Sequence, residues 1–157
     1  MLGSLARFNA QCCFALNIKA DGLASMLRDC LAKFSISNYF TFDMSVPQML
    51  SYRDAGLSFF TGQSDIQPSP VLYDEAAGIW ADCFTSTDWI TSSIISGHIR
   101  NGKRICFVSP ELHGRNDYYA FWEKLKGWDD DEALMLCTDF PDEAYEFFTG
   151  RRRNDAD

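Results

Sequence analysis

Short apolar runs alternate with longer amphipathic stretches along most of this chain. Each short run is bounded by polar residues or glycine, as is typical of a β-strand that other parts of the protein cover. The longer stretches carry apolar residues at helical spacing, as Leu23, Leu27 and Leu31 do after the first run. The pattern predicts strands at residues 14–19, 39–43, 57–62, 78–84, 104–109 and 134–139.

Capping residues indicate where some of the intervening helices begin and end. Ser45 can cap a helix that follows the second strand. In the stretch "DWITSSIISGHIRNGK", Thr87 or Asp88 could be the N-cap, and Asn101-Gly102 would end the helix.

A series of six strand-plus-helix units predicts an α/β fold, because strands joined by helical crossovers pair in parallel. The loop at residues 63–76 is longer than a usual connection from strand to helix. No low-complexity linker interrupts the series, and 157 residues with 46% hydrophobic content can bury one core. We expect a single domain over residues 1–150 and a solvated polar tail at residues 151–157.

The charge of the chain argues against a nucleic-acid partner. Lys and Arg total 14 against 22 for Asp and Glu, so the formal net charge of −8 would repel a phosphate backbone. No apolar segment approaches the roughly 20 residues of a membrane-spanning helix, and the first residues lack the layout of a signal peptide. We therefore expect a cytoplasmic protein with no membrane span.

The cysteines and histidines do not indicate disulfides or zinc. Cys12 and Cys13 are adjacent, and Cys106 and Cys137 lie within apolar runs, so the 6 cysteines are expected to be mainly buried free thiols. With 2 histidines and no Cys/His cluster, the sequence does not predict a structural zinc site.

Polar residues follow each predicted strand, and in a parallel α/β fold the ligand lies beyond these carboxyl ends. A single position of this kind is usually structural, since an aspartate such as Asp43 can cap a turn. The strand-end residues are Asn17, Lys19, Asp43, Thr61, Ser64, Asp82, Ser109, Glu111, His113, Arg115, Thr138 and Asp139.

Lys19 ends a run that is otherwise apolar. A lysine in such a place is costly to bury unless it faces an anion. Two interpretations stay open: a phosphate or metal-bound oxyanion, or an ion pair with Asp21 or Asp43.

The stretch "RICFVSPELHGR" closes an apolar run with an acid, an imidazole and a guanidinium. If the chain stays extended past Pro110, then Glu111, His113 and Arg115 lie on one side of it. Arginine suits bidentate phosphate binding, and histidine can transfer a proton near neutral pH. The structural alternative is that Glu111 pairs with Arg115 and that His113 caps a neighbouring helix.

Six segments together resemble a known superfamily. "FALNIKADGL", "YFTFDMSVPQML", "FFTGQSD", "GIWADCF", "ICFVSPELHGR" and "LCTDFP" are similar to the later strands of the glycerophosphodiester phosphodiesterase and phosphatidylinositol phospholipase C-like superfamily. The resemblance runs from about Ala15 to Phe148 and implies a TIM barrel that hydrolyses phosphodiesters with a divalent metal, Mg or Ca. It implies an incomplete barrel here, of about six parallel βα units.

The resemblance also assigns roles to strand-end residues. The family has an acidic residue two positions before a lysine at its third strand, and this pair corresponds to Asn17 and Lys19. Asparagine is a neutral oxygen ligand, so it would hold a metal more weakly than a carboxylate does. The expected residues are Lys19 and His113 for catalysis, Arg115, Ser109, Asp43 and Trp80 for substrate binding, and Asn17 and Glu111 for the metal.

The family's first two units have no counterpart in this chain. They carry a His-Arg-Gly motif, an acidic metal-binding pair and a further histidine, which supply most of the family's acid, base and metal ligands. Residues 1–13 would correspond to the helix before the third strand. An incomplete barrel leaves strand edges open, so we expect a partner chain or a second copy to cover them.

Three functional hypotheses follow. The first is a phosphodiesterase-like hydrolase that acts on a glycerophosphodiester or phosphoinositide-type substrate, as a phosphodiester small molecule or a lipid headgroup, and is impaired as an isolated chain. The second is a non-catalytic, truncated homologue that binds a phosphorylated ligand or associates with a partner chain. The third is an unrelated protein with a doubly wound open sheet, although no G-x-G-x-x-G or P-loop stretch indicates a nucleotide.

Overall fold

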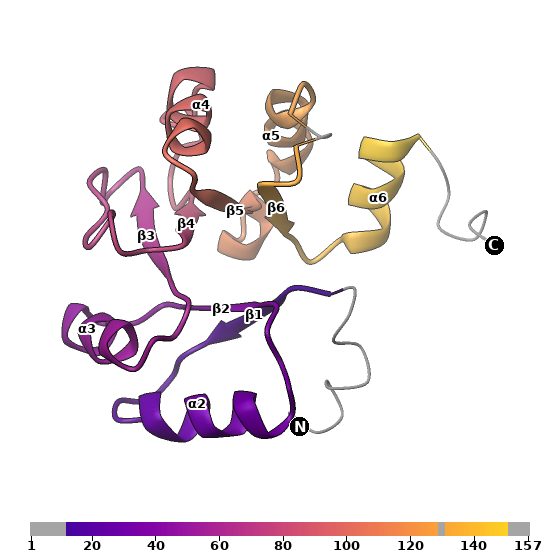
Figure 1. The fold of residues 1–157 in the computed structure, drawn as a ribbon. Coiled ribbons are helices and arrows are strands. Elements are labelled where there is room, and N and C mark those ends of the chain that lie inside the picture. Colours follow the sequence, from indigo (N-terminus) through magenta and orange to yellow (C-terminus); the bar gives the residue numbers. More distant parts are fainter. Residues whose placement is uncertain (1–11, 129–130, 151–157) are drawn as a thin grey trace. The chain divides into compact units, whose positions relative to one another are not determined.

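The computed structural model describes residues 12–128 and 131–150 (Figure 1). Its strands are β1 (Phe14–Asn17), β2 (Tyr39–Phe42), β3 (Phe60–Ser64), β4 (Gly78–Asp82), β5 (Arg104–Val108) and β6 (Leu134–Cys137). Its helices are α2 (Ala24–Lys33), α3 (Val46–Asp54), α4 (Ser92–Arg100), α5 (Tyr118–Leu125) and α6 (Pro141–Thr149), with a 3₁₀ helix, η2, at Pro110–His113.

The strands form two parallel sheets, and the predicted α/β class is confirmed. β1 pairs with β2, and β3, β4, β5 and β6 form a second sheet in chain order. An isolated parallel bridge joins Thr41 of β2 to Phe59, which directly precedes β3. Consecutive strands are therefore neighbours, as is usual when each crossover packs beside the strand that it follows.

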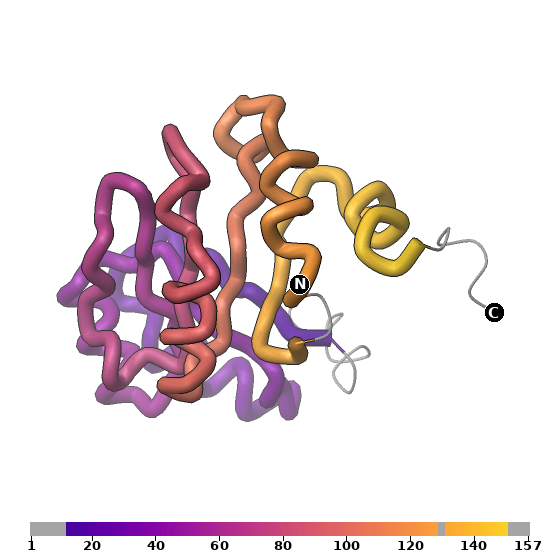
Figure 2. The backbone as a smooth tube through the Cα atoms, turned by 90° about the horizontal axis from the view of Figure 1, so that it is seen from above, coloured from indigo at the N-terminus to yellow at the C-terminus, as the bar shows by residue number. Residues whose placement is uncertain are grey.

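Two details differ from the sequence prediction. The connection from β3 to β4 holds turns and no helix, in agreement with the long loop predicted at residues 63–76, so one of the six expected strand-plus-helix units has no helix (Figure 2). Helix α4 is capped by Thr91, whose Oγ1 accepts from the Ile94 amide, rather than by Thr87 or Asp88. Ser45 does hold the N-cap position of α3, although its side chain makes no capping hydrogen bond.

The segments at both ends of the chain fall outside the described residues. These are the expected polar tail, residues 151–157, and most of residues 1–13, which were expected to correspond to a helix. No helix in the described part of the chain is long and apolar enough to cross a membrane.

Backbone contacts divide the chain into two compact units. The first comprises Met1–Gly62 with Ser69–Ile79, and the second comprises Gln63–Pro68 with Trp80–Asp157. The single domain expected over residues 1–150 stays a prediction.

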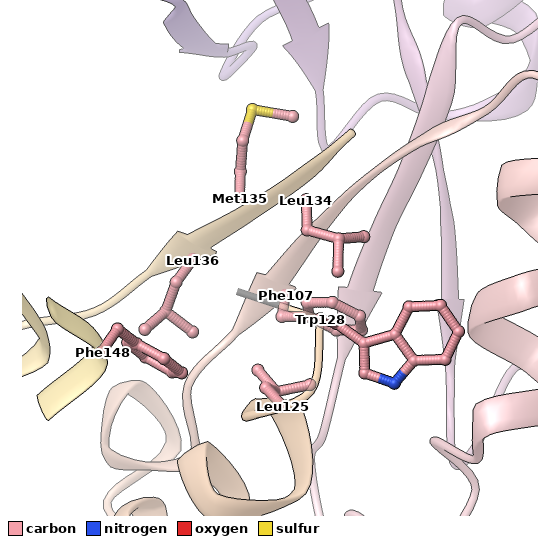
Figure 3. A pocket seen from close by; sticks show the side chains of 7 residues that line it. All are labelled: Phe107, Leu125, Trp128, Leu134, Met135, Leu136 and Phe148. Carbon is pink, nitrogen blue, oxygen red and sulfur yellow. The ribbon is translucent and has the colours of Figure 1, made fainter. Parts of the chain in front are cut away.

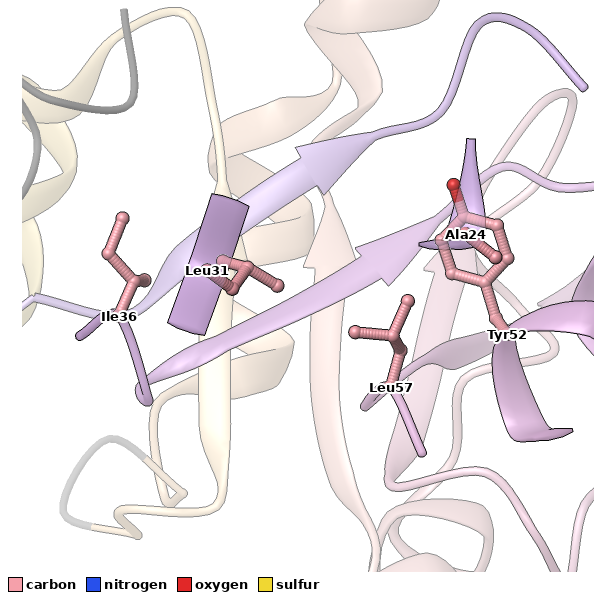
Figure 4. Close-up of a cluster of buried hydrophobic side chains, with 5 residues drawn as sticks. All are labelled: Ala24, Leu31, Ile36, Tyr52 and Leu57. Carbon is pink, nitrogen blue, oxygen red and sulfur yellow. The ribbon is translucent and has the colours of Figure 1, made fainter. Parts of the chain in front are cut away.

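The first unit has an aliphatic and aromatic core beneath α2 and α3. Leu31 of α2, Tyr52 of α3 and Leu57 are all nearly inaccessible to solvent (Figure 4). Phe40 of β2 stacks on Phe60 of β3, with ring centroids 3.8 Å apart and an interplanar angle of 10°. These contacts bury the apolar residues that define the strand and helix patterns of the sequence.

Trp122 of α5 is the largest fully buried side chain of the second unit. Its indole Nε1 donates to Ser109 Oγ at 2.9 Å, so its polar atom is satisfied in the core. The Ser109 amide in turn donates to the Cys137 carbonyl at 2.9 Å. The tryptophan thereby fixes the point where the chain leaves β5.

The cysteines are free thiols in every case that the structure describes. Of the two thiols in apolar runs, Cys106 is buried and Cys137 is half-buried. Cys83 is also buried, whereas Cys13 and Cys30 are half-buried and Cys12 is exposed, so the expectation of mainly buried thiols holds for only two of the six.

Tyr52 provides a test of the core of the first unit. Its hydroxyl oxygen is buried and has no hydrogen-bond partner within residues 12–128 and 131–150, and burial raises the pKa of the hydroxyl. Leaving such a group unsatisfied costs free energy, so Tyr52→Phe should raise the free energy of unfolding by about 1 kcal/mol. Urea unfolding followed by circular dichroism measures this change.

Tyr39→Phe is the matched control. The Tyr39 hydroxyl accepts a hydrogen bond from the Ser58 amide, so its loss should destabilise the chain instead. A Tyr52→Phe variant that is as destabilised as Tyr39→Phe would show that the Tyr52 hydroxyl has a partner in solution.

Candidate functional site

The polar residues of the second unit gather where β4, β5 and β6 end. In a parallel sheet these carboxyl ends lie at one edge, which is the usual ligand edge of α/β folds. Asp82 is the last residue of β4, η2 follows β5, and Thr138 directly follows β6.

His113 and Asp82 form the central interaction of this edge. His113 Nε2 lies 2.8 Å from Asp82 Oδ1, and the two side chains are only 22% and 17% exposed. The ring of Phe84 packs against the imidazole, with centroids 4.6 Å apart. Because the carboxylate can only accept, Nε2 carries the shared proton when Asp82 is ionised. Nδ1 is then the basic atom of a neutral imidazole, and within the described residues it has no partner.

The 3₁₀ turn of η2 explains how His113 reaches β4, and it overturns one expectation. We expected an extended segment past Pro110 that would place Glu111, His113 and Arg115 on one side. The chain turns instead, because Pro110 fits the first turn of a helix and Gly114 ends it at φ 72°. Glu111 consequently points toward the end of β6, while His113 points toward the end of β4.

Arg115 is occupied by groups of its own loop and of the residue after β4. Its Nε and Nη2 bind the two carboxylate oxygens of Asp117, and its Nη1 donates to the Cys83 carbonyl at 3.1 Å. The guanidinium is 21% exposed. Arg115 therefore ties the loop after β5 to the end of β4, and the expected pairing with Glu111 is not made.

Glu111 is held at the end of β6. Its Oε1 accepts from the Thr138 hydroxyl and from the Asp139 amide. Its Oε2 is buried and lacks a hydrogen-bond partner among the described residues. One carboxylate oxygen thus fixes the loop after β5 against β6, and the other is an unsatisfied acceptor.

Asp65, which directly follows β3, organises the loop after β4. Its two oxygens accept hydrogen bonds from the amides of Phe84, Thr85 and Ser86 and from the Thr85 hydroxyl. Burial alone would raise the pKa of Asp65, but these four bonds lower it from 3.8 to about 2. Asp65 thereby fixes the backbone that carries Phe84 against His113.

Two other titratable groups of the second unit are poor candidates for chemistry. Cys83 lies beside Arg115, but burial raises the pKa of its thiol to about 12, so it is not a thiolate nucleophile at neutral pH. His98 of α4 is buried against Gln63, with Nε2 and Oε1 2.8 Å apart, and burial lowers its pKa. Its role is structural.

The expected site residues of the first unit lie at the ends of β1 and β2. Lys19 Nζ lies 2.8 Å from Asp43 Oδ2, so the ion-pair interpretation describes this structure. Both side chains are exposed, by 73% and 56%, and Lys19 is therefore not a buried lysine in need of an anion. Asn17, the last residue of β1, is exposed.

Ser109 and Trp80 complete the expected set. Ser109 is fully buried beneath Trp122, so its hydroxyl serves the core rather than a ligand. Trp80 lies in the middle of β4 and is partly buried, with its interactions inside the protein.

The described residues do not fit a divalent metal on their own. They contain no group of three or more His, Cys, Asp or Glu side chains placed to hold an ion. Of the two expected ligands, Glu111 offers one unsatisfied oxygen in the second unit, and Asn17 belongs to the first unit. We assign no chemical step to a metal.

Sequence reasoning undervalued the aspartates of this edge. Asp82 was one of many polar strand-end residues, and Asp65 and Asp117 were not selected at all. Their common signal is an aspartate at, or just beyond, the end of an apolar strand or before a helix. That signal is weak in one sequence, because turns and caps use aspartate equally often.

No protein-family model, curated protein or solved structure matches this chain. The superfamily resemblance therefore stays a prediction.

Asp65 gives the first test of this edge. Asp65→Asn removes a carboxylate that accepts four hydrogen bonds, so it should lower the free energy of unfolding by about 1–2 kcal/mol at pH 7. Since the folded pKa is lowered, the stabilisation by Asp65 is present above pH 3.8 and is lost as the pH falls toward 2. Thermal unfolding of both proteins from pH 7 to pH 2 measures the difference.

Glu123→Gln is the control, because Glu123 is an exposed acid of the same unit, paired with Lys126. It should change stability little at any pH. A difference between wild type and Asp65→Asn that stays constant down to pH 2 would contradict the role assigned to the Asp65 carboxylate.

Proposed function

We propose that this chain is a phosphodiesterase-like protein in which His113, positioned by Asp82, is the proton carrier. The observation that carries the proposal is the 2.8 Å contact between His113 Nε2 and Asp82 Oδ1 at the carboxyl ends of β5 and β4. A carboxylate that orients an imidazole is the usual arrangement of a general base. The substrate class, a phosphodiester, comes from the sequence resemblance.

The orientation of the imidazole defines the step that it can perform. With its Nε2 proton donated to Asp82, the ring presents Nδ1 as a base. Nδ1 takes a proton from water while the water oxygen attacks phosphorus, the bond to the leaving alkoxide breaks, and the alkoxide takes up a proton to become an alcohol. A second proton carrier is needed for the leaving group, and the described residues do not supply an evident one.

Apolar side chains around His113 favour a substrate with an apolar part. Each of the four loops after β3 to β6 exposes one large hydrophobic side chain, and these are Ile66, Phe84, Leu112 and Phe140. Phe84 contacts the His113 ring, and Leu112 is the residue directly before His113 in the chain. Exposed apolar groups around a polar site are characteristic of ligand-binding surfaces. This supports a diester with an apolar substituent, such as a lipid.

The pairing of the expected cations, each within its own unit, supports the second candidate function, a non-catalytic homologue that binds a phosphorylated ligand or a partner chain. Both cations expected to hold phosphate are paired, Lys19 with Asp43 and Arg115 with Asp117. A phosphodiester would also meet the acids Asp82 and Glu111. Anion binding here requires either a counter-cation, such as the Mg or Ca of the predicted enzyme, or release of Arg115.

The deciding experiment is hydrolysis of bis(p-nitrophenyl) phosphate by the purified chain, with Mg²⁺ or Ca²⁺ present. His113→Asn should lower the rate by about 10²–10⁴-fold, because it removes the proton carrier. Asp82→Asn should also lower the rate, and combining the two should cost little more than His113→Asn alone, since both act on one proton. Release of p-nitrophenolate is followed at its absorbance maximum.

Glu123→Gln, an exposed change in the same unit, is the control and should keep the wild-type rate. Circular dichroism establishes that each variant is folded. Turnover that is equal in wild type and His113→Asn would eliminate His113 as the proton carrier.

Lys19 is tested in the same assay. If Lys19 binds the phosphate, Lys19→Ala should reduce turnover strongly and leave the fold intact, because its only described ion pair is exposed. Unchanged turnover would show that Lys19 only forms its ion pair with Asp43 and does not bind the substrate.

A chain that does not hydrolyse the substrate is tested for binding instead. Asp117→Asn frees the guanidinium of Arg115, so the affinity for glycerol phosphate should rise by about tenfold relative to wild type, as measured by calorimetry. Asp88→Asn, which removes a carboxylate paired with Lys124, is the matched control. Equal affinities of wild type and both variants for glycerol phosphate would show that Arg115 does not bind the phosphate.

A further inference from the structure

An apolar pocket of about 200 Å³ lies in the second unit, and none of the polar strand-end residues lines it (Figure 3). Its lining comes from β5, β6, the end of α5 and α6. The lining residues are Phe107, Leu125, Trp128, Leu134, Met135, Leu136 and Phe148, and none of them is charged.

The walls of this cavity are held in place by contacts of their own. On the strand side, Phe107 is paired in register with Leu136 in the parallel ladder of β5 and β6. On the helix side, Phe148 of α6 packs against Trp122 and Phe147, with ring centroids 6.2 and 5.0 Å away. Because both sides are anchored, neither strand nor helix can move freely into the space.

The apolar side chains of the lining determine which kind of ligand can bind. Phe107 and Leu125, which form the inner side, are nearly fully buried, and most of the lining surface is apolar. The pocket is partly open to solvent, since the β6 residues that line it are half-buried. Leu and Phe side chains offer no hydrogen bonds to water in the pocket, so a small apolar molecule can replace that water favourably. The volume is sufficient for one aromatic ring.

We propose that this cavity is a binding site for a small apolar ligand of about the size of one aromatic ring. The site is separate from the His113–Asp82 pair, and the proposal does not rest on the proposed hydrolase function. Binding removes apolar surface of the ligand and of the lining side chains from water, so apolar contact is its driving force.

The test is titration of the full chain with benzene, observed by NMR through the methyl resonances of Leu134 and Leu136, the two β6 side chains that point into the pocket in Figure 3. We expect saturable binding with shifts confined to these methyls and those of their neighbours in the cavity. Glycerol, a polar molecule of similar size, should cause no such shifts.

Filling the cavity with a larger side chain should weaken benzene binding. Leu136→Trp places an indole in the space, and Leu134→Phe is a milder change for use if Leu136→Trp does not fold. Either folded variant should bind benzene at least about tenfold more weakly than wild type. Met26→Trp is the matched control, since it adds the same indole at an exposed position of α2 in the first unit and should leave binding unchanged.

Two results would overturn the proposal. The first is the absence of saturable benzene binding to the wild-type chain, which would mean that the cavity closes in solution. The second is equal affinity in the folded filling variants, which would place the ligand elsewhere. Neither result bears on phosphodiester turnover.

Discussion

Parallel pairing of β4, β5 and β6 is the constraint on which the candidate site depends. Because all three strands run in one direction, the residues that follow them arrive at one edge of the sheet. Side chains distant in sequence then bind across neighbouring loops, as Asp82 does with His113 and Glu111 with Thr138. These polar contacts hold the loops in place, while the hydrogen bond from Trp122 to Ser109 fixes the start of η2.

The strands and most helices were predictable from the sequence, because their signals are local. An apolar run such as that of β5 predicts a buried strand in any context. Gly102 and Gly114, both at positive φ, mark the ends of α4 and η2. The loop after β3 was also predictable, since residues 65–77 lack a strong pattern of either kind. Their turns are fixed by contacts such as that of the Thr61 hydroxyl with the Val71 carbonyl.

The candidate site was predictable in location but not in its pairings. The sequence places His113 at a strand end. No feature of the neighbouring sequence, however, shows that Pro110 begins a 3₁₀ turn rather than an extended segment. That turn decides which partner each side chain meets. His113 binds Asp82 and does not cap a helix, and Arg115 pairs with Asp117 and not with Glu111. Pairings across loops depend on tertiary geometry, which one sequence without homologues does not specify.

The two predicted phosphate-binding cations differ in availability. Lys19 is largely exposed, and an exposed ion pair contributes at most about 1 kcal/mol, so an incoming anion could displace Asp43 at little cost. Arg115 is mostly shielded and joins two loops through three donors, so its release would loosen the very edge that holds His113. A ligand that keeps the site intact therefore has to bind without taking Arg115 from Asp117. For the proposed phosphodiester substrate, which is an anion, this favours binding at the second unit together with a cation.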